Sequence, residues 1–412
     1  MLSRIFKKTD VKKNLLISVI GTGLGQLIHL GTTPIISRIY SPEQFGQYSL
    51  FLSFLGVFTA ISLCKFDLAI IAAADDEVSK IRKILFKLAI ITSSLTLLVF
   101  ISLYIFDNTH SIIFLAITIT IPLSSKFWMH RSIINKAALF KRLSLGKILE
   151  NSTNGIVAIC LGVLNIKDIG LFAGKITALF VTWLFYRLKS AKLFTKETSL
   201  STKEIIQKHI NYPKYSFPAE LIAHLNLSSS IFIFAYLFTP LEVGFIGLTS
   251  RVMSVPANFV SISFFDVFKQ KAMEDFKQTG EFRTIFTKFL GILVVIATFM
   301  ILTIYFTGPY LFSLVFGAEW GKAGIYAQFL CIFYAIRLVA GPLIFSFEIT
   351  GRHYINLYFQ FIYLVVGIAG ILLTYYYTGD DLLCIKVYSL SLALIYSVHI
   401  LLAYTNSRKI KL

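Results

Sequence analysis

Charged residues inside long apolar runs are the part of this sequence best suited to chemistry. Arg251, Arg337 and Lys175 each lie within such a run. An arginine guanidinium stays charged, and its planar set of donors matches phosphate oxygens. Ionisable groups at membrane depth usually face a cavity or pair with one another. We therefore expect Arg251, Arg337 and Lys175, together with Arg38, to line a cavity and bind an anionic substrate; an ion pair that only locks helices together is the alternative.

A second candidate is the pair Glu220 and His224, which lie four residues apart and therefore on one face of a helix. Buried Glu and His side chains titrate near neutral pH, so this pair suggests proton coupling during a transport cycle. A structural hydrogen bond is the alternative. Charges near the ends of apolar runs have simpler explanations: Lys65 can extend its side chain to the interface, and Glu150 is expected to be solvated.

The sequence shows none of the motifs that mark common enzymes: no HExxH, P-loop, GxSxG or aspartate-rich metal motif. We therefore predict no catalytic site, no metal and no organic cofactor. Glycines at 21, 23 and 25 resemble part of a dinucleotide-binding loop, but they lie inside an apolar run with no strand before it. Small residues at this spacing let membrane helices approach closely, which predicts a packing role.

The composition is that of a protein that crosses a membrane many times. Of 412 residues 56% are hydrophobic and only 15% are charged, with a mean hydropathy of +0.75. A soluble domain carries about a quarter charged residues. The net charge of +18 is compatible with nucleic-acid binding, but the Lys and Arg residues lie mostly in short polar breaks between apolar runs. Membrane topology explains that pattern better, because cytoplasmic loops are enriched in Lys and Arg.

These breaks predict an all-α membrane fold. A span needs roughly 20 predominantly apolar residues, and the sequence provides twelve such segments: 14–36, 47–66, 84–106, 112–130, 147–164, 169–187, 217–239, 244–268, 286–306, 323–348, 354–376 and 383–404. With both termini in the cytoplasm, the inside segments hold about 26 Lys and Arg residues, whereas the outside segments, the longest being 307–322, hold Arg38, Lys167 and Lys322.

The spans divide into two halves of six. We expect an N-terminal lobe at 1–187, a cytoplasmic linker at 188–216 and a C-terminal lobe at 217–412, with a short interfacial helix after the capping-box spacing Ser201 to Glu204. The turn at 37–46 is nearly repeated at 235–244: each copy has an aromatic residue, Ser or Thr, Pro and then Gly. This pattern predicts one helix ending and another beginning in each half, the internal repeat expected of a two-lobed transporter.

Several motifs resemble those of the Wzx-type oligosaccharide flippases, in order and spacing over most of the chain. They are Ser37–Gly46, Phe66–Ile70, Phe316–Gly324, Ile336-Arg337 and Gly341-Pro342-Leu343. The resemblance implies membership of the superfamily that also holds MATE multidrug exporters and lipid II flippases. It implies two six-helix lobes around a central cavity that opens alternately to either side of the bacterial inner membrane.

The resemblance also implies the substrate: a sugar repeat unit on undecaprenyl diphosphate, moved to the outer leaflet for O-antigen or capsule assembly. Polymerase and chain-length proteins of polysaccharide assembly are the implied partners. Two other functions stay open. A cation-coupled drug exporter of the same superfamily should have an acidic cavity, whereas the mid-span charges here are mainly basic. A membrane polymerase needs room for catalysis, and the predicted outside loops are short.

Overall fold

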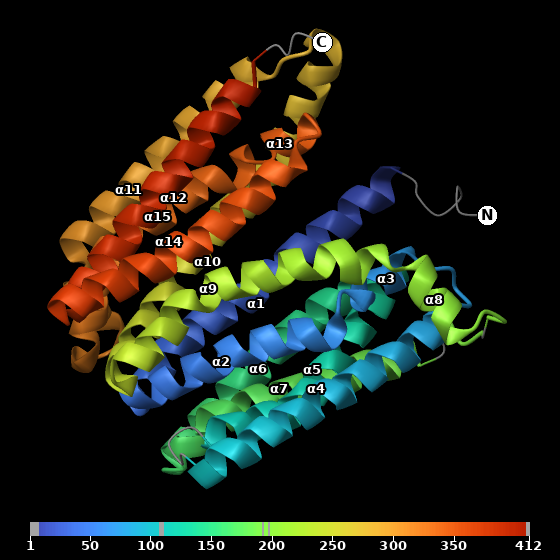
Figure 1. Ribbon diagram of the computed structural model, residues 1–412, viewed down its shortest axis with the longest axis horizontal. Coiled ribbons are helices and arrows are strands. Elements are labelled where there is room, and N and C mark those ends of the chain that lie inside the picture. The colour runs from blue at the N-terminus through green and yellow to red at the C-terminus, as the bar shows by residue number, and fades with distance from the viewer. Residues whose placement is uncertain (1–7, 107–110, 192, 197, 409–412) are drawn as a thin grey trace. The chain divides into compact units, whose positions relative to one another are not determined.

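The computed structural model describes residues 8–106, 111–191, 193–196 and 198–408, and in these ranges its regular structure is entirely helical. The α-helices (Figure 1) are α1 (Lys8–Ile39), α2 (Pro42–Leu63), α3 (Phe66–Ala72), α4 (Val78–Phe106), α5 (Ser111–Lys136), α6 (Phe140–Val163), α7 (Lys167–Ser190), α8 (Thr202–Lys208), α9 (Phe217–Leu237), α10 (Pro240–Thr279), α11 (Arg283–Phe316), α12 (Gly321–Leu343), α13 (Ser346–Ile349), α14 (His353–Thr378) and α15 (Asp381–Asn406). A π-helical turn, η3 (Tyr212–Ser216), precedes α9, and a 3-10 turn, η4 (Ala318–Trp320), precedes α12. The predicted all-α membrane fold is confirmed.

Ten of the twelve predicted spans fall on one long helix each, to within two residues at their ends. The span 47–66 runs past the end of α2 into α3, and the span 323–348 covers α12 and α13. In the described residues, ten helical segments are long and apolar enough to cross a membrane. Helix α6 falls short of that measure because of its polar segment 147–154, and α1 is not among the ten. That α1 and α6 cross the membrane remains a prediction.

The helices run farther than the spans. The segment 307–322, predicted to be a loop, is largely helical because α11 continues through Pro309 to Phe316. In the same way α5 continues to Lys136, so Arg131 lies on a helix and not in the predicted loop 131–146. Hydropathy marks where a helix meets the membrane boundary, whereas backbone hydrogen bonding continues past it.

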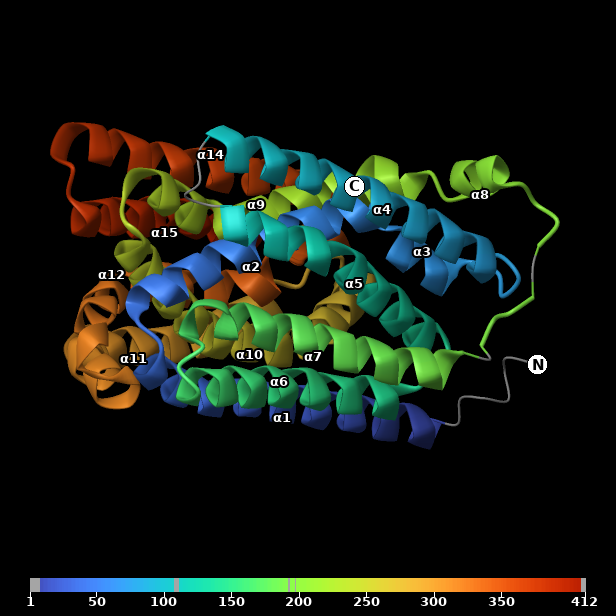
Figure 2. The ribbon, with the colours of Figure 1, turned by 90° about the horizontal axis from the view of Figure 1, so that it is seen from below.

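The chain forms two compact units, one comprising residues up to Tyr40 with Leu50–His224 and the other Ser41–Ser49 with the chain from Leu225 onward. In the first unit α1 and α6 run side by side (Figure 2). A methyl group at Gly21 would lie 2.1 Å from the Cβ of Ser144 on α6, and one at Gly25 would lie 3.0 Å from the Lys147 side chain. Packing is therefore the role of Gly21 and Gly25, as predicted, whereas a methyl group at Gly23 would meet no atom within 4 Å, so the prediction is wrong for Gly23.

The predicted helix in segment 188–216 is present as α8. The Ser201 hydroxyl accepts from the Glu204 N–H at 3.2 Å, and the Glu204 carboxylate accepts from the Ser201 N–H at 2.5 Å, which completes the capping box. Helix α8 is tied to the first unit by an apolar cluster that includes Phe66, Ile70, Val78, Ile81, Ile133 and Ile205.

Glu77, between α3 and α4, adds a buried polar tie to the segment after α8. Its carboxylate accepts hydrogen bonds from the Lys208 ammonium and, at 3.1 Å each, from His209 Nε2 and the Ala74 N–H. Burial alone raises the pKa of the Glu77 carboxyl, but these hydrogen bonds outweigh burial and hold its pKa below the ordinary value.

In the second unit, the two copies of the repeated turn pack against each other. A methyl group at Gly46, in the first turns of α2, would lie 2.0 Å from the Pro240 carbonyl oxygen of α10. Reciprocally, a methyl group at Gly244 would lie 1.8 Å from the Pro42 carbonyl oxygen. Both glycines of the repeat therefore serve one backbone-to-backbone crossing, which no other residue type fits.

An aromatic residue closes this crossing. Trp320 is fully buried and lies edge-on to Phe45 of α2 at 5.0 Å and to Phe245 of α10 at 6.1 Å between ring centroids. Phe45 immediately precedes Gly46 whereas Phe245 immediately follows Gly244, so the pseudo-symmetry of the repeat holds for the glycine contacts and not for these two rings.

Candidate functional site

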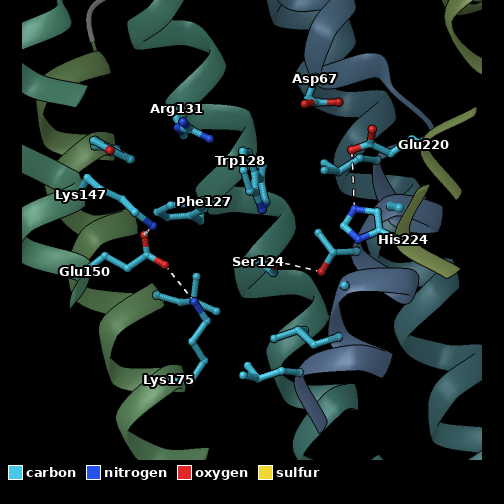
Figure 3. Close-up of a pocket in the computed structure, with 18 of the residues that line it drawn as sticks. Asp67, Ser124, Phe127, Trp128, Arg131, Lys147, Glu150, Lys175, Glu220 and His224 are labelled. Atoms are coloured by element: carbon cyan, nitrogen blue, oxygen red, sulfur yellow. Dashed lines mark hydrogen bonds and ion pairs between the residues drawn. The ribbon is translucent and has the colours of Figure 1, made fainter. Parts of the chain in front are cut away.

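A cavity of about 420 Å³ opens within the first unit. Helices α2, α3, α5, α6 and α7 and the beginning of α9 contribute side chains to its wall. Two groups of charged side chains lie on opposite walls, with the aromatic side chains of α5 between them (Figure 3).

One group is centred on Glu150 of α6. Its two carboxylate oxygens accept from two ammonium groups: Oε1 from Lys175 Nζ of α7 at 2.8 Å and Oε2 from Lys147 Nζ at 3.1 Å. Glu150 is buried, so the expectation that it is solvated is wrong. A buried carboxylate is stable only when paired, and two lysines on one carboxylate leave this group with a net positive charge.

The other group joins the junction of α2 and α3 to α9. Lys65 Nζ lies 3.0 Å from Glu220 Oε2, and His224 Nε2 lies 3.6 Å from Glu220 Oε1. Gly56 of α2 leaves room for the imidazole, since a methyl group there would lie 3.2 Å from His224 Nδ1. Lys65 thus pairs across helices and does not extend outward as expected for a residue at the end of a span.

The backbone at this junction is strained. Cys64 and Lys65 have φ values of 42° and 60°, in the left-handed region that costs an L-residue roughly 1–2 kcal/mol. The left-handed backbone at Cys64 and Lys65 ends α2 and turns the chain into α3. Lys65 and Asp67 thereby lie on the cavity wall. Strained non-glycine residues of this kind cluster at functional sites.

Between the two groups lies Arg131 of α5. Its guanidinium lies 4.6 Å from the centre of the Trp128 ring, and within the described chain no carboxylate lies within 4 Å of it. Arg131 is exposed to the solvent. A cavity cation without a carboxylate partner can bind an incoming anion without first breaking an ion pair.

The structure therefore brings Lys175, Glu220 and His224 into one cavity. Lys65, Asp67, Arg131 and Lys147 complete its charged lining, and the sequence analysis did not select them as site residues. Each lies at a helix end or in a segment predicted to be a loop, where charge is normally solvated. They become part of a site because helices that are distant in the sequence pack around them.

The remaining predicted cations lie elsewhere. Arg251 of α10 belongs to the second unit, where it lies over the rings of Tyr48 at 5.2 Å and Phe45 at 5.9 Å. Arg337 of α12 lies in the same unit, near enough to Tyr334 and Tyr396 to interact electrostatically with both.

Neither Arg251 nor Arg337 has a carboxylate within 4 Å among the described residues. Arg38 is exposed in the last turn of α1. In the described part of the chain, no cluster of three His, Cys, Asp or Glu side chains is arranged to hold a metal ion.

Comparisons with known proteins agree with this architecture. Residues 35–324 match the model of a family described as polysaccharide biosynthesis protein. Among solved structures, the fold is similar to that of the lipid II flippase MurJ in an inward closed conformation, with a TM-score of 0.74 and 13% identity over 95% of this chain and 87% of that one.

Two further structures have the same fold. An inward-facing MATE family transporter of the MOP superfamily matches with a TM-score of 0.68 and 14% identity, covering 95% of this chain and 97% of that one. A MOP superfamily transporter from Pyrococcus furiosus matches with a TM-score of 0.53 and 14% identity over 96% and 94%. No curated protein sequence matches the chain.

Proposed function

The chain belongs to the polysaccharide biosynthesis protein family, and from that premise we propose that it is a flippase for lipid-linked oligosaccharides. The substrate is a sugar repeat unit on undecaprenyl diphosphate, which the protein moves across the bacterial inner membrane for O-antigen or capsule assembly. The protein is a transporter and not an enzyme in this proposal. Its two lobes, 1–187 and 217–412, expose the cavity to one side of the membrane at a time.

The observation that carries the proposal is the cationic cavity of the first unit. Glu150 is paired with Lys147 and Lys175, and Glu220 is paired with Lys65. Counting Arg131 and Asp67 as well, four cations face three carboxylates, so the cavity keeps a surplus positive charge. A diphosphate is dianionic or more, and cations in a partly dehydrated cavity bind it with charge-assisted hydrogen bonds. The polyprenyl tail then stays in the lipid while the diphosphate and the sugars stay in the cavity. The apolar tail therefore avoids water, and the polar part avoids the hydrocarbon.

Within this proposal, Arg131 makes the first contact with the diphosphate. Arg251, Arg337 and Arg38 supply further cations in the transport cycle, and Lys175 is released from Glu150 when the anion replaces that carboxylate. Proton coupling through Glu220 and His224 is part of the proposal, because the pair faces the cavity that the substrate enters.

The test begins with deletion of the gene, followed by analysis of surface polysaccharide and of the leaflet that holds the lipid-linked repeat unit. A flippase predicts loss of polysaccharide with the repeat unit trapped on the cytoplasmic side. Single unpolymerised units on the outside would identify a polymerase instead. Normal polysaccharide with altered drug sensitivity would identify an exporter.

Variants then test the cavity. Arg131→Gln should lower export by about tenfold or more, since a hydrogen bond to a charged group contributes about 1.5–3 kcal/mol. Arg187→Gln is the matched control, because Arg187 also lies over a tryptophan ring, Trp183 at 5.4 Å, but does not line the cavity. Equal export by the two variants at equal protein levels would refute the assigned role of Arg131.

Unchanged export after neutral replacement of Arg251 and Arg337 together would show that neither residue binds the substrate during transport.

A further inference from the structure

Asp67 is a buried carboxylate on the cavity wall that the proposed substrate contacts do not use. It lies in the first turn of α3 with 9% of its surface exposed, and its Oδ1 atom has no hydrogen-bond partner within the described chain. Burial raises the pKa of the Asp67 carboxyl above its ordinary value. An orphaned carboxylate oxygen costs folding free energy, and a bound proton would lower that cost.

The position of Asp67 is firmly fixed. Its neighbours on α3, Phe66, Ala69 and Ile70, are buried in the apolar cluster with α4 and α8. On the other side of the helix, Asp67 lies above Glu220 on the same wall of the cavity (Figure 3). The packing of Phe66, Ala69 and Ile70 therefore holds this turn of α3, and Asp67 with it, beside the cavity.

Two neighbouring charges act on Asp67 in opposite directions. The Lys65 ammonium favours the ionised carboxylate, whereas the Glu220 carboxylate disfavours it. Lys65 is paired with Glu220 at 3.0 Å in this structure, and Arg131 of α5 faces the same cavity.

Other cations on the elements that pack against α3 bind other partners. These contacts are Lys136 with Asp75, Lys80 with the Leu200 carbonyl, Arg82 with the Leu193 carbonyl, and Lys214 with the Tyr215 ring. Among charged side chains, Lys65 and then Glu220 therefore act on Asp67, while the backbone N–H groups of Asp67 and Leu68 also favour the ionised carboxylate.

We propose that Asp67 is a proton-binding site, and that its protonation decides whether Lys65 pairs with Glu220 alone or is shared by both carboxylates. One proton from the aqueous phase binds the Asp67 carboxylate and makes it a neutral acid. The group of Lys65, Asp67 and Glu220 then changes from a net charge of minus one to zero. Loss of the proton restores the second carboxylate, which competes with Glu220 for the single ammonium.

This exchange acts on α9. Glu220 holds the beginning of α9 to the strained junction of α2 and α3, while the rest of α9 belongs to the second unit. Weakening the Lys65–Glu220 pair therefore loosens one tie on a helix that runs from the first unit into the second. The inference rests on the proposed function and deepens it, because it adds Asp67 as a proton site beside Glu220 and His224, with Glu220 also serving as the ion-pair partner of Lys65.

The test is an infrared titration of the purified full chain in detergent, without substrate. The carbonyl band of a protonated carboxylic acid should titrate above the ordinary range of aspartate, about 3.9, and Asp67→Asn should remove it. Asp266→Asn is the matched control, because Asp266 is exposed on α10 and its loss should leave that band in place. A band that persists in Asp67→Asn, or is lost in Asp266→Asn, would overturn the proposal.

Two further variants test the same site without altering Asp67. Lys65→Gln should raise the midpoint of the titration, and Glu220→Gln should lower it, because each variant removes one neighbouring charge. Unchanged midpoints in both variants would overturn the proposal even if Asp67→Asn did not fold. A failed export assay with a normal titration would refute the flippase function and leave the proton site intact.

Discussion

The crossing of α2 and α10 gives a prediction that can be worked from distances. A methyl group at Gly244 would lie 1.8 Å from the Pro42 carbonyl oxygen and 2.7 Å from the carbonyl carbon. Nonbonded heavy atoms in contact lie about 3.5 Å apart, so Gly244→Ala requires the two backbones to separate by roughly 1.5 Å. No side-chain rotation relieves the contact, because both atoms belong to the helix backbone.

Separating α2 from α10 also disturbs the packing of Trp320 at their crossing. Trp320 contacts Phe45 on one side and Phe245 on the other, so moving the helices apart loosens a fully buried ring. Overpacking of this kind costs about 1–3 kcal/mol. We expect Gly46→Ala and Gly244→Ala each to lower the apparent melting temperature of the purified protein by several degrees, and the double variant to cost less than the sum, because one separation serves both.

The matched control is Gly291→Ala. Gly291 lies in the middle of α11, and a methyl group there meets no atom within 4 Å. Alanine is favoured over glycine in a helix by about 1 kcal/mol, so this variant should be neutral or slightly stabilised. A Gly244→Ala protein as stable as Gly291→Ala would refute the close crossing and, with it, the structural meaning of the repeated turn.

Three further predictions concern buried polar contacts. Glu150→Gln should destabilise the fold by about 3 kcal/mol, because Lys147 and Lys175 lose their shared carboxylate, and Lys175→Gln added to it should recover part of the loss in denaturation experiments. Above about pH 6, the wild type should be more stable than Glu77→Gln by a constant amount. This difference in stability should vanish as the pH falls through the lowered folded-state pKa of Glu77, below about 4.3. A difference that grows in acid would contradict the lowered pKa of Glu77. Tyr40→Phe should cost about 1 kcal/mol by removing the buried hydrogen bond from Tyr40 Oη to the Ala158 carbonyl at 2.7 Å, whereas Tyr236→Phe, at an 82% exposed tyrosine, should cost nothing measurable.

The sequence anticipated single residues of the site better than it anticipated their partners. Lys175, Glu220 and His224 stood out because each is an ionisable residue within an apolar run. Glu150 did not, since it lies beside polar residues of α6 that resemble a helix end in solvent. The Glu150 carboxylate can be buried because two lysines pair with it, one of them on α7. No local pattern in the sequence indicates that pairing.

The repeated turn also separates what the sequence predicts from what depends on helix packing. The sequence alone indicates two helix starts with Ser or Thr before Pro and Gly four residues later. That the two glycines meet each other's proline carbonyl is a property of the packed helices. Glycine in a helix is also compatible with simple flexibility, so the contact had to be seen before the residue could be explained.

The sequence by itself determined the all-helical membrane architecture, the centres of the long helices, and the family to which the chain belongs. It could do so because hydrophobicity is a local property and because the membrane interior requires backbone hydrogen bonds to be satisfied within each segment. Only the tertiary structure decided that Lys65 meets Glu220, that Arg131 has no carboxylate partner among the described residues, and that Asp67 is buried beside them. Those facts depend on which helix faces are brought together, and charge pairing between distant segments leaves no periodic signal in the chain.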